Sequence, residues 1–457
     1  MKLVKEIFRE YDIRGIYGEE LDEETAYYIG RAYGTKLKEY GKSKAVLAHD
    51  NRLSSDILSE YMIKGLTETG IDVIDLGVIP TPLCTTLTAT LNVDMSIMIT
   101  ASHNPFQDNG LKLINENGDK FTDAQTSLLE QKLNKLTDDN CFSPNKIGQV
   151  QKIYAGLENY LSTIKTFALP NSLSGMKIVL DSANGALSGI LGPVFEYLGA
   201  ETINLACFPD GYNINADCGS QHTEKLCKCV VDNKFDLGIA VDGDGDRIII
   251  CDESGHRLDG DQIIAFLATY FKKHNMLKAN AVVATVYSNL GLGKYINSLG
   301  IKYYTSTVGE RYVIEKMREV GSNIGGEESG HMVLSDYSKT GDALITAVVI
   351  CLGIKETTQK VSAIFPLFKP FPASSHNLRF DNKEIINQIM ASPIVQNCIS
   401  DIKNRLQDHG LILMRKSGTE PVIRLKIEDE SANLAENETQ KLLNCIEKTA
   451  KELNTNV

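Results

Sequence analysis

Short apolar runs rich in β-branched residues alternate along this chain with longer stretches in which apolar residues recur at helical spacing. The run at 44–50 predicts a buried strand, and the stretch at 54–69 predicts a helix that ends at Gly70. Two further strands are predicted at 71–77 and 95–100, with a helical stretch between them. This alternation is typical of an α/β fold.

The same order of elements occurs three times. In the second and third copies a helix ends near Gly199 and Gly300, where a helix C-terminus favours a left-handed residue. The strand-bearing segments of these two copies are 177–185, 201–208, 237–247, 281–291, 301–309 and 322–331. We therefore predict three related α/β domains of βαβαβ type.

The C-terminal part of the chain differs from the repeats. Three prolines between Phe365 and Pro372 predict a linker, and the following sequence, to Val457, predicts a smaller α+β domain. A polar, turn-rich stretch at 138–152 predicts the separation of the first two repeats. The expected domains are residues 1–150, 151–252, 253–365 and 366–457.

Composition restricts the class of protein. Hydrophobic residues make up 42% and charged residues 23% of the 457 positions, which is typical of a globular protein, and the net charge of −12 argues against wholesale nucleic-acid binding. The first residues carry charges throughout instead of the apolar segment of a signal peptide. The longest apolar run, 345–354, is about half a membrane span. We expect a cytoplasmic protein with no nucleic-acid or membrane partner.

The ten cysteines are scattered over a long chain, so we expect reduced thiols that lie mostly in the core. The tightest group is Cys218, Cys227 and Cys229, with His222 as the available fourth ligand of a zinc site. Their spacing fits no common zinc pattern, which argues against such a site.

A polar loop follows the third predicted strand of each repeat. Ligands of open parallel sheets bind beyond the carboxyl ends of strands, so three such loops from similar domains are expected to meet at one cleft. The first loop, TASHNP, places Ser102 and His103 after an apolar strand, where backbone amides stabilise an anion. A plain polar turn is the alternative, and the G-x-S-x-G pattern of a hydrolase nucleophile is absent.

The second loop, DGDGDR, alternates carboxylates with glycines. Asp242, Asp244 and Asp246 are expected to point the same way from an extended segment, while the glycines let the backbone curl, and to hold a hard cation such as Mg²⁺. An EF-hand would also use these positions and Glu253, but Arg247 stands where that loop needs glycine. A solvated acidic turn is a third interpretation. Since Arg247 is a cation beside a cation site, we expect a phosphate between them.

The third loop, GEESGH, places Glu327, Glu328, Ser329 and His331 among glycines. Adjacent carboxylates and a hydroxyl suit the hydroxyl groups of a sugar. A turn that caps a helix is the alternative interpretation.

The C-terminal domain contains RKSGTEPVIR, a sequence that combines cations and hydroxyls around a glycine. Free backbone amides, hydroxyls and arginine together bind phosphate dianions, and the Walker pattern is absent. The residues expected to bind the phosphate are Arg415, Lys416, Ser417, Gly418, Thr419 and Arg424.

A serine, a divalent metal, a sugar loop and a phosphate loop together indicate phosphoryl transfer on a sugar phosphate. The ordered set TASHNP, DGDGDR, GEESGH and RKSGTEP resembles the α-D-phosphohexomutase superfamily over nearly the whole chain. The resemblance implies four domains around a central cleft, with Ser102 phosphorylated. It also implies Mg²⁺ held by the phosphoserine, Asp242, Asp244 and Asp246.

The resemblance further implies a mechanism. Phosphorylated Ser102 passes its phosphoryl group to a hexose monophosphate, a hexose 1,6-bisphosphate turns over in the cleft, and the other phosphate returns to the serine. Lys112 is the implied general base, and Arg14, His103 and Arg247 are implied to hold the reacting phosphate. The substrate-binding residues would be Glu327, Ser329, His331, Arg415, Ser417, Gly418, Thr419 and Arg424.

Two features bear on the sugar. The stretch DGYNINADCGSQH at 210–222 is similar to the phosphoglucosamine mutase branch, whereas YDIRGIYG near the start resembles phosphomannomutase/phosphoglucomutase enzymes. Glu328 replaces the glutamine or asparagine usual in the first branch. We expect glucosamine phosphate, with mannose or glucose phosphate as the alternative, in a monomer or homodimer. A non-catalytic sugar-phosphate sensor and a phosphatase are competing interpretations of the same residues.

Overall fold

The computed structural model describes residues 7–8, 13–134, 142, 144–416 and 421–454. The chain forms two compact units. The first comprises Met1–Val286 and Lys302–Leu367, and the second comprises Tyr287–Ile301 and Phe368–Val457.

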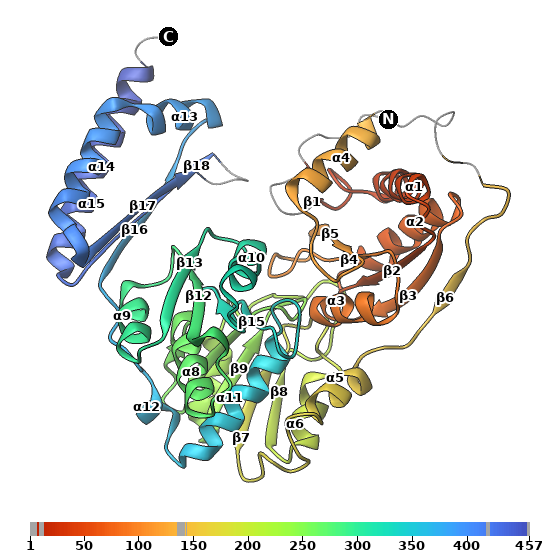
Figure 1. Cartoon of the computed structure of the whole chain (residues 1–457), viewed down its shortest axis with the longest axis horizontal. Helices are drawn as coiled ribbons and strands as arrows, with labels where there is room; N and C mark the ends of the chain where they lie inside the picture. The colour runs from red at the N-terminus through yellow and green to blue at the C-terminus, as the bar shows by residue number, and fades with distance from the viewer. Residues whose placement is uncertain (1–6, 9–12, 135–141, 143, 417–420, 455–457) are drawn as a thin grey trace. The chain divides into compact units, whose positions relative to one another are not determined.

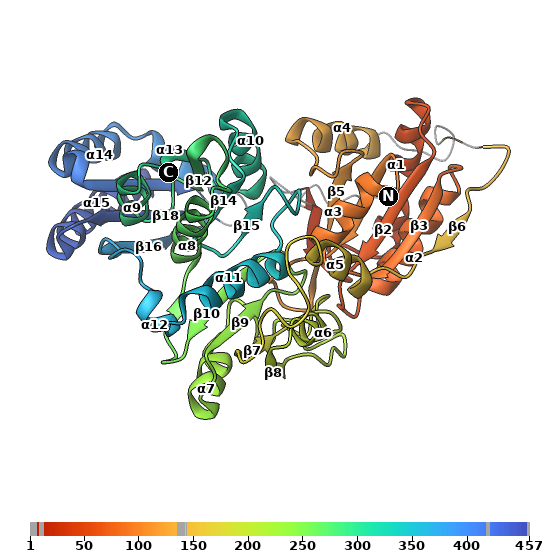
Figure 2. The same ribbon diagram turned by 60° about the horizontal axis from the view of Figure 1, so that its bottom comes forward.

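The first unit contains three sheets (Figures 1 and 2). The six-stranded sheet has the order β1-β5-β4-β2-β3-β6, the five-stranded sheet β11-β10-β9-β7-β8, and the four-stranded sheet β13-β12-β14-β15. Their strands are β1 (Ile13–Ile16), β2 (Lys44–His49), β3 (Asp72–Val78), β4 (Met95–Ile99), β5 (Asp108–Asn115), β6 (Val150–Lys152), β7 (Lys177–Asp181), β8 (Glu201–Leu205), β9 (Leu237–Val241), β10 (Ile248–Asp252), β11 (Arg257–Leu258), β12 (Ala281–Thr285), β13 (Lys302–Ser306), β14 (Ile324–Gly326) and β15 (Met332–Leu334).

The predicted repeat is present in the topology. Each sheet contains three parallel strands in the order second-first-third, followed by an antiparallel strand beside the third. Gly70, Gly199 and Gly300 have φ angles of 77°, 81° and 71°, the left-handed conformation expected after the helices. The three polar loops follow β4, β9 and β14, as predicted.

Helices cover these sheets because their apolar faces are buried against the strands. The apolar run at 345–354 lies in α11 and is almost wholly buried, and α11 lies across β9 and β10 (Figure 2). None of the described helices is long and apolar enough to cross a membrane. The helices of the unit are α1 (Glu23–Glu39), α2 (Ser55–Thr67), α3 (Thr81–Thr90), α4 (Asp123–Asn134), α5 (Leu157–Ile164), α6 (Leu191–Tyr197), α7 (Glu224–Asn233), α8 (Gly260–Lys273), α10 (Glu310–Val320), α11 (Ala343–Thr357) and α12 (Val361–Ile364).

The second unit is the α+β domain expected from the tail. Its antiparallel sheet has the order β16-β18-β17, with helices along one face (Figure 1). Along β18, apolar side chains enter the core on this face and charged side chains alternate with them. The elements are β16 (Ala373–Arg379), β17 (Gly410–Lys416), β18 (Val422–Asp429), α9 (Leu290–Ser298), α13 (Lys383–Ala391), α14 (Pro393–Leu406) and α15 (Ala432–Asn454).

The inclusion of α9 in this unit was not expected from the proline-rich linker. Glu428 of β18 is fully buried, and its carboxylate accepts a hydrogen bond of 2.9 Å from the backbone N–H of Leu290. Phe371 N–H donates to Asn289 Oδ1 at 2.8 Å. The helix therefore joins the C-terminal sheet because its first turn supplies donors to a buried carboxylate.

Close packing of α1 on α2 yields a prediction about stability. A Cβ atom on Gly65 would lie 2.2 Å from the backbone oxygen of Tyr27, so Gly65→Ala must separate the two helices. We expect the free energy of unfolding in urea to fall by about 2–3 kcal/mol. Gly189→Ala is the control, because nothing lies within 4 Å of its added Cβ. Equal stability of both variants would contradict the prediction.

Candidate active site

The nucleophile loop leaves β4 in a strained conformation. Ser102 is buried and has a φ angle of 53°, a left-handed value that is unusual for serine. Its N–H donates to Thr100 Oγ1 at 2.9 Å, and its hydroxyl donates to Asp242 Oδ2 at 2.7 Å. The loops of the first and second repeats therefore meet at the serine oxygen, as the order of the strands predicts.

Two residues that sequence reasoning missed hold this loop. Arg52 is buried and donates to the carbonyl oxygens of Ser102 and Asn104, both at 2.9 Å. Asp50 binds Arg52 Nε at 2.9 Å. Asn215 donates to the same two carbonyls at 2.9 and 3.0 Å. The available signal was a charged pair directly after β2, whose carboxyl end lies beside that of β4.

The carboxylates of Asp242, Asp244 and Asp246 come together as predicted, with one oxygen of each within 4.8 Å of the others. The predicted cause is right only in part, since the segment curls as a turn at the glycines and is not an extended strand. Gly245 N–H donates to the backbone oxygen of Asp242 at 3.1 Å with φ at 74°. Asp242 Oδ1 then accepts from the N–H groups of Asp246 and Arg247, at 3.1 and 3.0 Å.

The electrostatics of this cluster fit a divalent cation. Burial, together with the charges of Asp246 and Asp244, raises the pKa of Asp242 well above its usual range. One oxygen each of Asp244 and Asp246 is buried without a hydrogen-bond partner among the residues that the structure describes. Buried carboxylate oxygens of this kind are ligands that Mg²⁺ prefers, so the donor set fits that ion.

Lys112, the predicted base, reaches this cluster from β5. It is buried, and its Nζ lies 2.5 Å from Asp244 Oδ2 and 2.9 Å from Asp246 Oδ2. Burial would raise the pKa of Asp246, but the positive charge of Lys112 holds it well below its usual range. The lysine and the carboxylates therefore form one buried charged group.

The other side chains predicted to hold the reacting phosphate are His103, Arg247 and Arg14. His103 Nδ1 is 3.4 Å from the serine hydroxyl, and Arg247 Nε is 3.9 Å from Asp246 Oδ1. Arg14 lies on β1 opposite Gly110 of β5. Burial, followed by the charges of Arg247 and Arg14, lowers the pKa of His103 to about 3. The imidazole is thus neutral and can donate a hydrogen bond to an anion.

The predicted sugar loop is joined to the metal loop by backbone pairing. Arg247 and His331 form an antiparallel bridge, and Ile248 N–H donates to the backbone oxygen of Gly330 at 3.0 Å. Glu327 is buried and accepts from Gly309 N–H at 3.0 Å, whereas Ser329 is half-buried. The structure therefore brings this loop to the carboxylate cluster.

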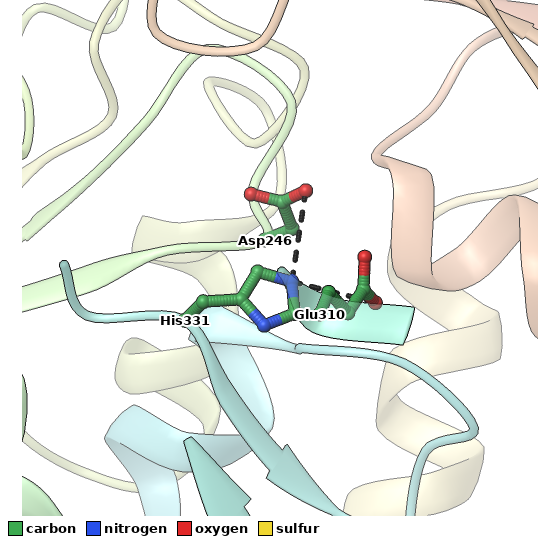
Figure 3. Close-up of side chains that lie close together, drawn as sticks. All are labelled: Asp246, Glu310 and His331. Atoms are coloured by element: carbon green, nitrogen blue, oxygen red, sulfur yellow. Dashed lines mark ion pairs between the residues drawn. The ribbon is translucent and has the colours of Figure 1, made fainter. Parts of the chain in front are cut away.

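His331 lies between two carboxylates (Figure 3). Its Nε2 is 3.4 Å from Glu310 Oε1 and 3.8 Å from Asp246 Oδ2. Both carboxylates also pair with lysines, Glu310 with Lys120 and Asp246 with Lys112. Because these cations already offset the two negative charges, the trio does not call for a second metal ion. Sequence reasoning missed Glu310, which comes from α10 and reaches His331 only in the folded chain.

In the second unit, Arg415 of β17 lies opposite Arg424 of β18. Lys416 ends β17, and its Nζ donates to Asn387 Oδ1 at 3.2 Å. The remaining residues predicted to bind the distal phosphate, Ser417, Gly418 and Thr419, lie outside the described residues.

The nine cysteines in the described part of the chain are free. Neither group of side chains there that could hold a metal contains a cysteine.

Comparison with known proteins identifies the family of the chain and its fold. Four family models match the chain in the order of its domains. They are phosphoglucomutase/phosphomannomutase α/β/α domain I at residues 5–140, domain II at 158–255, domain III at 259–371 and the C-terminal domain at 376–444. The chain belongs to the phosphoglucomutase/phosphomannomutase family. The predicted superfamily, fold class and isomerase activity of a phosphohexomutase are thereby confirmed.

Relatives within this family include enzymes named phosphoglucosamine mutase. Those of Parvibaculum lavamentivorans and Paramagnetospirillum magneticum are 40% and 37% identical, over 90% and 98% of this chain and 91% and 100% of theirs. A phosphoglucomutase/phosphomannomutase family protein from Burkholderia thailandensis has the same fold, with a TM-score of 0.83 at 24% identity and 98% coverage of both chains. The Aspergillus fumigatus N-acetylphosphoglucosamine mutase, solved with GlcNAc-6P and magnesium, has a TM-score of 0.62 at 14% identity, over 92% of this chain and 96% of its own.

The carboxylate cluster yields a prediction about metal binding. Asp244→Asn should weaken the affinity for Mg²⁺ or Mn²⁺ by at least about 100-fold, since changes even to outer-shell groups cost 10- to 100-fold. Isothermal titration calorimetry on the full chain measures the affinity.

Glu253→Gln is the matched control for this experiment. An EF-hand would use Glu253, but in the structure this residue accepts from Ser362 N–H at 3.0 Å. We expect its affinity for the ion to equal that of the wild type. Weaker affinity for the ion in Glu253→Gln, or unchanged affinity in Asp244→Asn, would refute the metal site.

Proposed function

We propose that the protein interconverts glucosamine 6-phosphate and glucosamine 1-phosphate through a phosphorylated Ser102 and glucosamine 1,6-bisphosphate. The observation that carries the proposal is the 2.7 Å hydrogen bond from Ser102 to Asp242, which are 140 positions apart. It joins a buried hydroxyl to a carboxylate cluster fitted for a cation, the pair of features that phosphoryl transfer to and from serine requires. The relatives named phosphoglucosamine mutase support the choice of sugar.

The first transfer forms a bond between phosphorus and the free hydroxyl of the monophosphate, and it breaks the bond from phosphorus to Ser102 Oγ. The ammonium of Lys112, which in the structure donates to Asp244 and Asp246, first releases a proton. The neutral amine then takes the proton of the sugar hydroxyl. In the second transfer the other phosphate returns to Ser102, and Lys112 gives its proton to the departing sugar oxygen.

The remaining side chains hold the reacting groups. His103 Nδ1 lies beside the Ser102 hydroxyl, and Arg247 Nε lies 3.9 Å from Asp246 Oδ1. The neutral imidazole of His103 and the guanidinium of Arg247 would donate to the transferring phosphoryl group. Arg14 would add positive charge from β1. Mg²⁺ held by Asp242, Asp244 and Asp246 would neutralise charge on that group.

Glu327 and Ser329 would contact the sugar hydroxyls, and His331, held between carboxylates, would bind the substrate. Arg415 and Arg424 would hold the distal phosphate.

The four domains are proposed at 1–150, 151–252, 253–365 and 366–457. The ranges of the family models support these limits, and the free cysteines fit a reducing cytoplasm. A monomer or homodimer is proposed.

A second candidate is a phosphomannomutase/phosphoglucomutase, which the YDIRG sequence around Arg14 favours. The assay that separates the candidates supplies glucosamine 6-phosphate, mannose 1-phosphate or glucose 1-phosphate with Mg²⁺ and a trace of the matching bisphosphate. We expect the highest kcat/KM with the glucosamine phosphate and no release of inorganic phosphate. A preference for mannose or glucose phosphate would overturn the substrate, release of phosphate would indicate a phosphatase, and binding without turnover would indicate a sensor.

The serine yields a prediction about turnover. Ser102→Ala removes the oxygen that carries the phosphoryl group, so kcat should fall at least about 1,000-fold while the fold is retained. Ser188→Ala is the control, since its hydroxyl donates to Gly185 O in a turn. Intact-mass measurement should find one phosphate on the active wild type. An active Ser102→Ala enzyme with unphosphorylated wild type would disprove the phosphoserine mechanism.

A further inference from the structure

Tyr287 contacts the predicted phosphate-binding arginine in two ways. Arg415 Nε donates a hydrogen bond of 2.9 Å to the Tyr287 hydroxyl, and the guanidinium carbon lies 4.9 Å from the centre of the tyrosine ring. The tyrosine belongs to the second unit by its contacts, although it directly follows the third repeat's first strand in sequence. Sequence analysis assigned no function to it.

The backbone at Tyr287 and at Leu290 is held by the same sheet. Lys426 of β18 donates to the carbonyl oxygen of Tyr287 at 2.6 Å and pairs with Glu428 at 2.7 Å. Glu428 in turn accepts from Leu290 N–H at 2.9 Å. Lys426 and Glu428 are both more than nine-tenths buried, so these contacts form a rigid support and not a surface association.

The arginine that Tyr287 contacts lies in an unfavourable electrostatic position. Arg415 stands opposite Arg424 on the neighbouring strand, and like charges directly opposite each other destabilise a sheet. Their repulsion would turn the two guanidinium groups apart, whereas a phosphate dianion needs them to converge. A contact that fixes one guanidinium therefore favours binding of a dianion before it arrives.

We propose that Tyr287 is a positioning residue, which holds the guanidinium of Arg415 in the orientation that receives the distal phosphate of the sugar phosphate. Because the tyrosine oxygen accepts from Nε, the two terminal nitrogens are directed away from the tyrosine and form the bidentate edge offered to phosphate. The inference rests on the phosphate-binding function proposed for Arg415. Tyr287 itself does not contact the reacting atoms.

The test compares variants that remove the two contacts in turn. Tyr287→Phe keeps the ring and removes the hydroxyl, and we expect KM for glucosamine 6-phosphate to rise about five- to tenfold with kcat changed less than twofold. Tyr287→Leu also removes the ring and should raise KM further. Tyr154→Phe is the control, because that side chain is 98% exposed. Thermal unfolding verifies that each variant is folded.

Binding measurements separate positioning from a structural effect. Calorimetry on the Ser102→Ala protein should show the same five- to tenfold loss for glucosamine 6-phosphate in Tyr287→Phe. In an Arg415→Lys background, Tyr287→Phe should add less than twofold, because the aligned guanidinium is already gone. Unchanged affinity in Tyr287→Phe, or a full additional loss in the Arg415→Lys background, would overturn the proposal.

Failure of the proposed function is distinguishable from failure of this inference. A wild-type protein without mutase activity would refute the glucosamine phosphate reaction. Tyr287 is then tested with inorganic phosphate as the probe, whose affinity Tyr287→Phe should still weaken about fivefold. Equal affinity of wild type and Tyr287→Phe for inorganic phosphate would overturn the positioning residue alone.

Discussion

Burial of Asp242, Asp244 and Asp246 in one turn costs free energy that positive charge and hydrogen bonds must offset, since each carboxylate raises the energy of the other two. The protein supplies part of that charge from another sheet, through Lys112 of β5. The Ser102 hydroxyl supplies a hydrogen bond to the same cluster. The first two repeats are thus held together where Ser102, Lys112 and the three carboxylates meet, and the electrostatic demand of the carboxylates is what unites them.

The repeated topology brings these side chains together through short loops. In each repeat the third strand lies beside the first, so its carboxyl end opens at the middle of the sheet and its loop is supported on both sides. Arg52 shows the consequence, because it follows β2 and holds the loop after the neighbouring β4. The bridge between Arg247 and His331 extends the same arrangement to the third repeat. A threefold repeat of one sheet order has therefore produced three loops with three different chemical tasks.

Much of this organisation could be predicted from the sequence, because strands, helix ends and polar loops leave local signals. The loops after β4, β9 and β14 carry their chemistry within a few consecutive residues. Glu310 and Tyr287 gave no such signal, since each contacts a partner far along the chain that only the fold brings near. The signal of Arg52 was limited to its charged pair with Asp50 directly after β2. The reason predicted for the convergence of the three aspartates was right only in part. The curl expected at the glycines is present as a turn at Gly245, whereas alternation along an extended segment has no part in it.

Within the net charge of −12, the protein has one local concentration of negative charge and one of positive charge. The metal loop gathers negative charge that a cation relieves, and the strands β17 and β18 place Arg415 opposite Arg424, a repulsion that an anion relieves. Each group of like charges has a lower free energy with its ligand bound than without it. Ligand binding therefore offsets a repulsion that remains in the folded protein. A neutral sugar would relieve neither of these two repulsions. A phosphate dianion would relieve the repulsion between the two arginines, and a divalent cation would relieve the repulsion among the three carboxylates.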